Sequence, residues 1–175
     1  MKPESRTDAP PATEKWASFH LAGELFALRV EEVQEVLMQQ PITPVPLAPD
    51  FIIGLVNLRG RISLAIDLRR RLQLPPRADG APSVLLVLKH KEGLIGVVVD
   101  EMEDVLELPT SAWRTPPDTL AEEHRGFVAG VCPTAGRLVL GLRTDPLSGG
   151  EQSITARDAA PDSNAPPTGG GRVAE

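Results

Sequence analysis

Few residues of this chain combine the types and spacings that enzymatic or metal chemistry requires. The three histidines, His20, His90 and His124, lie far apart, and none has a second ligand at the spacing of a zinc motif. The one cysteine, Cys132, can form neither an internal disulfide nor a cysteine-based zinc site. There is no Gly-x-Ser-x-Gly elbow, and the glycine run at 169–171 lacks the lysine of a phosphate-binding loop. We therefore expect no catalytic residue, no metal and no cofactor.

An acidic cluster is the nearest approach to a reactive site, and it comprises Asp100, Glu101, Glu103 and Asp104. A calcium loop would need glycine at its sixth position, where Val105 stands. Solvated charges at the end of a strand are the favoured interpretation. A small hydrolase that uses Asp100, Asp104 and Arg59 is a minor alternative, because no triad or metal motif accompanies these residues.

Arg59 is the residue that the local sequence singles out for binding. Asn57-Leu-Arg-Gly60 has asparagine first and glycine fourth, which predicts a type I turn between two extended segments. Arg59 is then at the tip of a β-hairpin and points outward. Arginine is enriched at interaction hot spots, and its guanidinium offers five donors in a rigid fork.

The elements that would position these residues are mostly short strands. Alternating or continuous apolar runs predict strands over 16–22, 24–28, 54–58, 62–68, 83–88, 94–99, 102–108, 127–132 and 137–142. In the fourth of these, Ile62, Leu64, Ile66 and Leu68 are expected on one buried face. A glycine inside the sixth, Gly96, indicates a bulge or a close backbone approach.

One helix is expected, over residues 30–38. Val30, Val33 and Leu37 fall at i, i+3 and i+7, so a helix would place them on one apolar face. Glu35 would then point away from that face. Pro41 ends this segment.

Composition supports a β-rich binding module. The 175 residues include 18 prolines and 15 glycines, too many for a helical bundle, and 41% are hydrophobic. The net charge of −6 argues against nucleic acid. The arginine run 69–71 is interpreted as a solvated face. Neither a signal peptide nor an apolar run of ~20 residues is visible, which predicts a cytoplasmic location without membrane insertion.

Several motifs resemble the CheW family of chemosensory adaptors. The segment 49–60, continued to 69, is similar to the family signature. Residues 33–36 resemble the family's first helix, and 96–100 with 104–106 resemble its central hairpin. Residues 127–130 and 137–140 are similar to its last hairpin, so the likeness spans 16–147.

This resemblance implies a mainly β fold of two packed, five-stranded SH3-like barrels with short helices. The expected organisation is a tail at 1–13, a domain at 14–147 divided near 75–82, and a tail at 148–175. The resemblance also implies a non-catalytic scaffold between chemoreceptors (methyl-accepting chemotaxis proteins) and the histidine kinase CheA. One surface would dock the kinase regulatory domain, and a groove between the barrels would hold the receptor's helical hairpin. The chain would thereby be recruited to membrane-associated receptor arrays. The implied partner-binding residues are Val33, Glu35, Gly54, Asn57, Leu58, Arg59, Gly60, Gly96 and Val105.

Two departures from the family pattern accompany the likeness. Leu64 stands where the family usually has proline. The family's C-terminal helix is reduced to one turn at 145–147, with Asp145 as its expected cap and Pro146 as its first residue. A related role is therefore a second alternative: a CheW-like module in motility, development or surface behaviour that lacks, or competes for, one interface.

Overall fold

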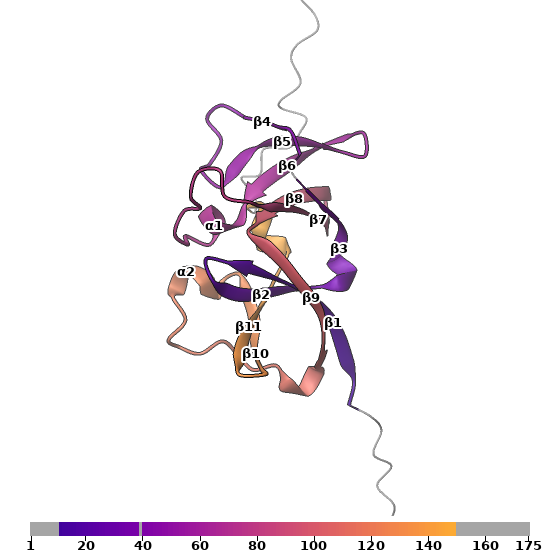
Figure 1. Ribbon diagram of the computed structural model, residues 1–175, viewed down its shortest axis with the longest axis vertical. Helices are drawn as coiled ribbons and strands as arrows, with labels where there is room; N and C mark the ends of the chain where they lie inside the picture. The colour runs from indigo at the N-terminus through magenta and orange to yellow at the C-terminus, as the bar shows by residue number, and fades with distance from the viewer. Residues whose placement is uncertain (1–10, 39, 150–175) are drawn as a thin grey trace, which may run out of the picture.

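Two packed β-sheets dominate the computed structural model, which describes residues 11–38 and 40–149 (Figure 1). The first sheet has the order β10-β11-β2-β1-β9, with strands β1 (Thr13–Leu21), β2 (Glu24–Arg29), β9 (Glu101–Pro109), β10 (Val128–Thr134) and β11 (Arg137–Leu142). The second has the order β3-β7-β8-β6-β5-β4, with strands β3 (Val33–Leu37), β4 (Ile42–Thr43), β5 (Ile52–Leu58), β6 (Arg61–Asp67), β7 (Val84–His90) and β8 (Gly93–Val99). The mainly β prediction is confirmed.

The two sheets are interleaved along the chain. It leaves the first sheet after β2, builds the whole second sheet, and returns between β8 and β9. A division near 75–82, as predicted from the sequence, does not separate the sheets, because that segment connects α1 (Leu68–Arg71) to β7 next to the second sheet. The first sheet therefore combines strands from both ends of the described chain, and the second is built from the segment between them.

In the described part of the chain, helical structure is limited to short turns. Besides α1 there is α2 (Glu122–Arg125), and single 3-10 turns occur at η1 (Val30–Glu32), η2 (Thr110–Ala112) and η3 (Asp145–Ser148). Among the described residues, no helix has the length and apolar character needed to cross a membrane.

The helix predicted over 30–38 is wrong. Only η1 is helical there, and β3 follows it with alternate burial, half-buried at Val33, Glu35 and Leu37. This strand pairs antiparallel with β7, from Val33 opposite Leu88 to Leu37 opposite Leu85. Pairing satisfies backbone groups along the outer side of β7, and β-branched valines suit a strand, so tertiary pairing overrides the helical spacing.

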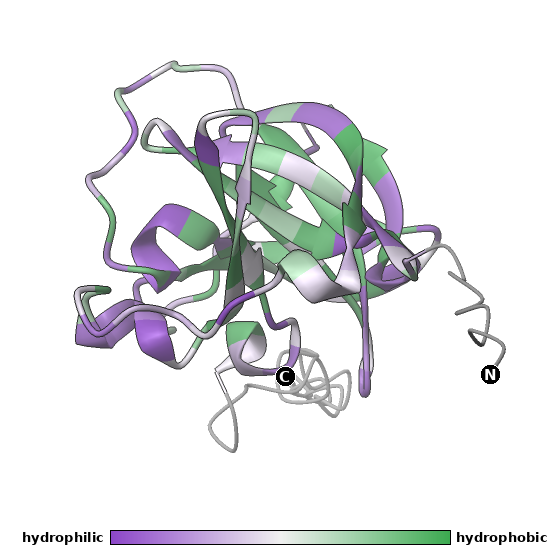
Figure 2. Ribbon diagram, turned by 90° about the horizontal axis from the view of Figure 1, so that it is seen from below, coloured by the Kyte–Doolittle hydropathy of each residue, from purple (hydrophilic) through white to green (hydrophobic). Residues whose placement is uncertain are grey.

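The packed interior has three parts. The largest lies between the sheets and joins Phe19 and Phe26 of the first to Leu86 and Val97 of the second. Each of the other two is built from the strands of one sheet, the first around Trp16 and the second around side chains such as Val56, Leu58 and Leu85. In Figure 2 the hydrophobic residues lie mostly on the strands, and the short helices are largely hydrophilic.

Strand β6 departs from the predicted alternation. Ile66 is fully buried between the sheets, whereas Ile62 on the same face is 54% exposed. Ser63 and Ala65, which a strict alternation would place on the solvent face, are buried. The strand is covered on both faces near the sheet interface and on neither face at Ile62 near its hairpin tip.

Both predicted tails, 1–13 and 148–175, include residues that belong to the folded domain. Thr13 already belongs to β1, and the carbonyl of Ala12 accepts a hydrogen bond from the Thr110 amide (2.9 Å). At the other end Ser148 is buried. The rest of the predicted tails, residues 1–10 and 150–175, lies outside the described residues.

The predicted C-terminal turn is present as η3, and it ends at Gly149 with a positive φ of 101°. The expected capping role of Asp145 is wrong, since the residue at the N-cap is Thr144, and no side chain caps the turn.

Candidate partner-binding surface

Arg59 lies at the tip of the β5–β6 hairpin, as predicted, but in a different turn. Arg59 and Gly60 both have positive φ, 54° and 81°, and Leu58 pairs with Arg61 across a two-residue loop. Positive φ at both central residues is the pattern of a type I′ turn, which matches the twist of the flanking strands. Asn57 Oδ1 accepts a hydrogen bond from the Gly60 amide (2.8 Å) and supports the loop. The predicted type I turn is therefore wrong, although the position of the tip is right.

The guanidinium of Arg59 is held by Glu35. Arg59 Nε donates to Glu35 Oε1 at 2.9 Å, and Nη2 donates to Oε2 at 3.0 Å. The side chain of Arg59 is 63% exposed, and that of Glu35 is 21% exposed. This hydrogen bonding from Arg59 lowers the pKa of Glu35, and the carboxylate correspondingly raises the pKa of Arg59.

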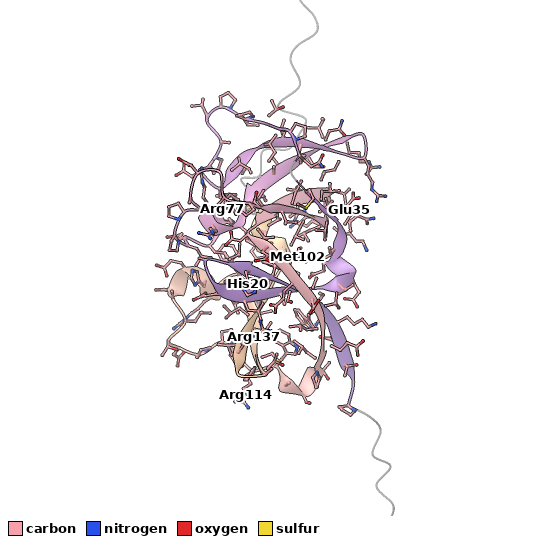
Figure 3. All side chains as sticks on the ribbon, in the orientation of Figure 1. His20, Glu35, Arg77, Met102, Arg114 and Arg137 are labelled. Atoms are coloured by element: carbon pink, nitrogen blue, oxygen red, sulfur yellow. The ribbon has the colours of Figure 1, made fainter. Side chains whose placement is uncertain are left out.

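The ion pair joins two parts of the second sheet that are distant in strand order. Glu35 is on edge strand β3, whereas Arg59 is on the hairpin of β5 and β6, next to the opposite edge. The sheet must curl to bring them together, and Figure 3 shows Glu35 on β3 on the same side of the molecule as the β5–β6 tip. The contact thus closes the sheet toward a barrel.

Large apolar side chains are exposed on the same elements. Val36, the next residue on β3, is 47% exposed, Met38 is 73% exposed, and Ile62 is 54% exposed. We call Glu35, Val36, Met38, Arg59 and Ile62 the Arg59 surface. Val36 follows Glu35 on β3 and therefore points to the opposite face of the strand, whereas Ile62 is on the same hairpin as Arg59. Exposed apolar side chains on the strands that carry a bidentate arginine are a combination expected at an interaction site.

The other residues implied by the family resemblance divide into exposed and buried groups. Asn57 and Gly60 are exposed at the hairpin tip. Val105 is 57% exposed but lies on β9 of the first sheet, and Val33 is half-buried against the core between the sheets. Leu58 is only 1% exposed, inside the curl of the second sheet.

Both glycines of the implied set are buried where backbone or side chains approach closely. A Cβ atom on Gly54 would lie 2.3 Å from the Thr43 carbonyl oxygen, and its φ is 150°. A Cβ atom on Gly96 would lie 3.0 Å from Leu85 Cδ1 and 3.4 Å from Val56 Cγ1. The close approach predicted at Gly96 is present. These two residues shape the second sheet from within.

Asp100 is the single residue between β8 of the second sheet and β9 of the first. The prediction that it is a solvated charge is wrong, because its side chain is only 16% exposed. Its carboxylate accepts from Arg69 Nη2 at 2.6 Å, from Arg77 Nε at 3.1 Å and from the Ala22 amide at 2.8 Å. Burial opposes ionisation, but these donors outweigh it and lower the pKa of Asp100. The cluster ties the return crossing to α1 and to the β1–β2 turn.

The remaining charged runs are also structural. Glu103 accepts from Arg137 (2.7 Å) and lies 3.1 Å from His20 Nε2, and bonding to Arg137 lowers the pKa of Glu103. Arg71 donates to the carbonyls of Pro146 and Leu147, with its guanidinium over Phe51 and Phe127. The run 69–71 is thus not a uniformly solvated face.

No ion pair or side-chain hydrogen bond joins the three residues of the hydrolase alternative, Asp100, Asp104 and Arg59. Arg59 binds Glu35, and Asp100 binds Arg69 and Arg77, whereas Asp104 is exposed. Within residues 11–38 and 40–149, no group of three or more histidine, cysteine or acidic side chains could hold a metal ion. The arrangement offers binding surfaces and ion pairs.

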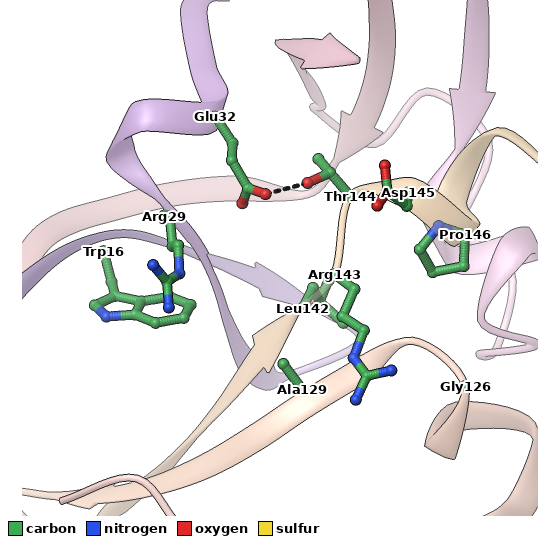
Figure 4. A pocket seen from close by; sticks show the side chains of 10 residues that line it. All are labelled: Trp16, Arg29, Glu32, Gly126, Ala129, Leu142, Arg143, Thr144, Asp145 and Pro146. Atoms are coloured by element: carbon green, nitrogen blue, oxygen red, sulfur yellow. Dashed lines mark hydrogen bonds between the residues drawn. The ribbon is translucent and has the colours of Figure 1, made fainter. Parts of the chain in front are cut away.

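Two adjoining cavities, lined mainly by residues of the first sheet and its connections, were not predicted. Their volumes are about 540 and 450 Å³, and they share Trp16, Arg29, Ala129 and Arg143; Figure 4 shows the larger of the two. Trp113 packs 4.2 Å from Trp16 between ring centroids, in a slot where a Cβ on Gly130 or Gly141 would touch its ring. The only sequence signal was the presence of just two tryptophans in an otherwise aliphatic chain.

The comparisons with known proteins agree with one another. A family model described as a CheW-like domain matches residues 15–151. Chemotaxis protein CheW of Rhizobium meliloti is 27% identical over 139 residues, covering 79% of this chain and 90% of the relative. Protein PilI of Pseudomonas aeruginosa is 26% identical over 122 residues, covering 69% of this chain and 68% of the relative.

The solved structure of the scaffolding protein TtCheW from Thermoanaerobacter tengcongensis has a TM-score of 0.73 at 28% identity, covering 79% of this chain and 94% of that one. The two-sheet fold, the signature around Arg59 and these matches lead to one conclusion: this chain belongs to the CheW family.

Proposed function

We propose that this chain is a non-catalytic scaffold that couples chemoreceptors to a CheA-type histidine kinase. Membership of the CheW family supports this proposal, as do relatives named chemotaxis proteins and a similar structure named a scaffolding protein. The observation that carries the proposal onto particular residues is the exposed, pre-oriented ion pair of Arg59 and Glu35.

The Arg59 surface is proposed as part of the receptor contact. Glu35 holds the arginine in one geometry, so less side-chain freedom is lost when a partner binds. The guanidinium uses Nε and Nη2 on Glu35, which leaves Nη1 with no hydrogen bond to a described residue. A helical hairpin from a receptor would offer carboxylates and helix-end carbonyls to such a donor. Ile62, which is exposed on the same hairpin, would supply apolar contact beside it.

The kinase regulatory domain is proposed to dock on a surface that does not depend on Arg59. The chain has two sheets with separate exposed residues, including Val105 on the first. Two independent contacts would let one scaffold hold both partners at once, and this arrangement would bring the chain to receptor arrays at the membrane.

Co-purification tests the proposal. Tagged chain is expected to retain both the receptors and the CheA-type kinase of its host, and Arg59→Ala is expected to lose receptor preferentially. Arg61→Ala is the matched control, because Arg61 is exposed in the same hairpin and forms no ion pair or side-chain hydrogen bond with the described residues. Failure to retain either partner, or equal loss in both variants, would contradict the proposal.

A second candidate role is the same scaffold acting in a related pathway. The match to PilI supports it, because the family evidently includes proteins with names other than CheW. Retention of a kinase and receptor from a set separate from the host's chemotaxis proteins would select this role, and retention of only one partner class would indicate a competitor that lacks one interface.

A further inference from the structure

The smaller of the two adjoining cavities has the character of a binding groove. It measures about 450 Å³, within the range of roughly 300–1,000 Å³ found for ligand sites. Two tryptophans, Trp16 and Trp113, form its aromatic wall, and Pro116 and Ala129 add apolar surface. We call it the tryptophan groove.

Its charge is opposite to that of the whole protein. Three arginines, Arg29, Arg114 and Arg143, line the groove with a single carboxylate, Glu14, although the chain carries a net charge of −6. Arg29 is engaged, since Nη1 lies 3.3 Å from Glu14 Oε1 and the guanidinium lies 5.5 Å from the centre of the Trp16 ring.

The other two guanidiniums are available. Neither Arg114 nor Arg143 has a side-chain hydrogen bond or ion pair with another described residue, and both are exposed. Figure 4 shows Arg143 extended beside Ala129, and Figure 3 shows Arg114 at the end of the molecule opposite β4 and β5. Both arginines therefore line the groove without an ion pair to a described residue.

The neighbouring cavity extends the groove and changes its charge. It continues past Arg143 to Glu32, Asp145 and Pro146, and Glu32 there accepts a hydrogen bond from Thr144. A small anion would occupy only the arginine end of such a trough. An extended chain directs alternate side chains to opposite sides, so its acidic side chains can reach the arginines while its apolar side chains contact the tryptophans of the same cavity.

From these observations we propose that the tryptophan groove binds an extended acidic peptide segment of a protein partner. The acidic side chains pair with Arg114 and Arg143, and an apolar side chain packs against Trp113. Nucleic acid is disfavoured, because the surrounding protein is acidic and would repel a continuous phosphate backbone. The groove belongs to the first sheet, whereas the Arg59 surface belongs to the second, so the two sites are independent.

The two tryptophans are the only ones in the chain, which makes them specific reporters. Both indole nitrogens are enclosed and have no hydrogen-bond acceptor among the described residues. Movement of either ring, or a new acceptor, will therefore shift its indole N–H resonance. The probe is an acetylated hexapeptide of alternating glutamate and leucine, added to the full chain while indole resonances and tryptophan fluorescence are followed.

Saturable shifts of both indole signals are expected with the glutamate peptide, and none with the same peptide carrying lysine. Arg114→Glu combined with Arg143→Glu is expected to weaken binding about tenfold or more, because like charges then face each other. The control is Arg61→Glu combined with Lys91→Glu, which makes the same change in net charge on exposed residues of the second sheet and should leave the affinity unchanged.

Four results would overturn the inference. One is the absence of saturable indole shifts, and another is equal weakening in the control variant. A thymidine hexanucleotide that binds as tightly as the peptide would assign the groove to a phosphate backbone instead. Occupation by the chain's own acidic C-terminal residues would also refute a partner site. It would appear as indole shifts in ligand-free full chain when Glu151→Gln, Asp158→Asn and Asp162→Asn are combined.

Discussion

Arg59 and Glu35 are separated by 24 residues, yet they form two parallel hydrogen bonds of 2.9 and 3.0 Å that link the β5–β6 tip to edge strand β3. This geometry is the fork-on-carboxylate arrangement that arginine forms and lysine does not. Because both side chains reach solvent, the pair contributes more to orientation than to folding.

The first prediction is that Arg59→Ala leaves the fold intact and weakens receptor binding. The melting temperature should stay within about 2 °C of the parent, since exposed ion pairs contribute little. Receptor affinity should fall about tenfold, the scale of an interface hot spot. Circular dichroism melts and a receptor-fragment titration check both, and Arg59→Lys should recover only part of the affinity.

A charge swap separates orientation from direct contact. Glu35→Arg combined with Arg59→Glu preserves the ion pair but inverts it. If the pair served only to hold the hairpin tip, the swapped protein would bind receptor normally. We expect it to fold normally and bind as poorly as Arg59→Ala.

The second prediction tests the strand phase of β3. Val33 packs against the core between the sheets, whereas Val36 is 47% exposed. Val33→Asp should destabilise the protein by about 2 kcal/mol or more, because it buries a carboxylate without a partner. Val36→Asp, with the same change in charge, should alter stability by no more than about 0.5 kcal/mol. Urea unfolding measures both. Equal losses would argue against the alternation seen in β3.

The third prediction concerns the buried glycines. Gly54→Ala should cost about 3 kcal/mol or prevent folding, because its Cβ would meet the Thr43 carbonyl oxygen and its φ of 150° disfavours any side chain. Gly96→Ala should cost about 1 kcal/mol, since the flexible end of Leu85 can shift. Thermal melts of the two variants decide the order. A binding defect in Gly96→Ala at full stability would place that residue on a partner surface instead.

The fourth prediction is a dependence of stability on acid. The pKa of Asp100 is lower in the folded protein than in the unfolded chain, where it is about 3.9. Its contribution is therefore present above about pH 4 and is lost as pH falls through the folded pKa. Asp100→Asn should lower the free energy of unfolding by about 1–3 kcal/mol at pH 7 and by less at pH 3.

Urea unfolding at both pH values provides the measurement for Asp100. Asp104→Asn is the control, because Asp104 is exposed and its side chain forms no ion pair or hydrogen bond with the described residues. A deficit for Asp100→Asn that is equal at both pH values would show that the carboxylate charge is not what stabilises the crossing.

Local sequence alone determined most of the strands and the position of Arg59. The hairpins around Gly23, Arg59, Glu92 and Gly136 were predictable, because tight turns and their flanking apolar runs are encoded within a few neighbouring residues. The same short-range signature around Arg59 carried the family resemblance, and with it the expectation of a scaffold.

Only the tertiary structure decided which contacts form between segments that are distant in the sequence. Residues 33–37 are too few to distinguish a helical from an alternating pattern, and pairing with β7 made them a strand. The partner of Arg59 is on that strand, so the ion pair could not be seen from the sequence. The tryptophan groove likewise joins residues from 14 to 143. Such contacts depend on how the sheets curl and interleave, and no local pattern specifies that packing.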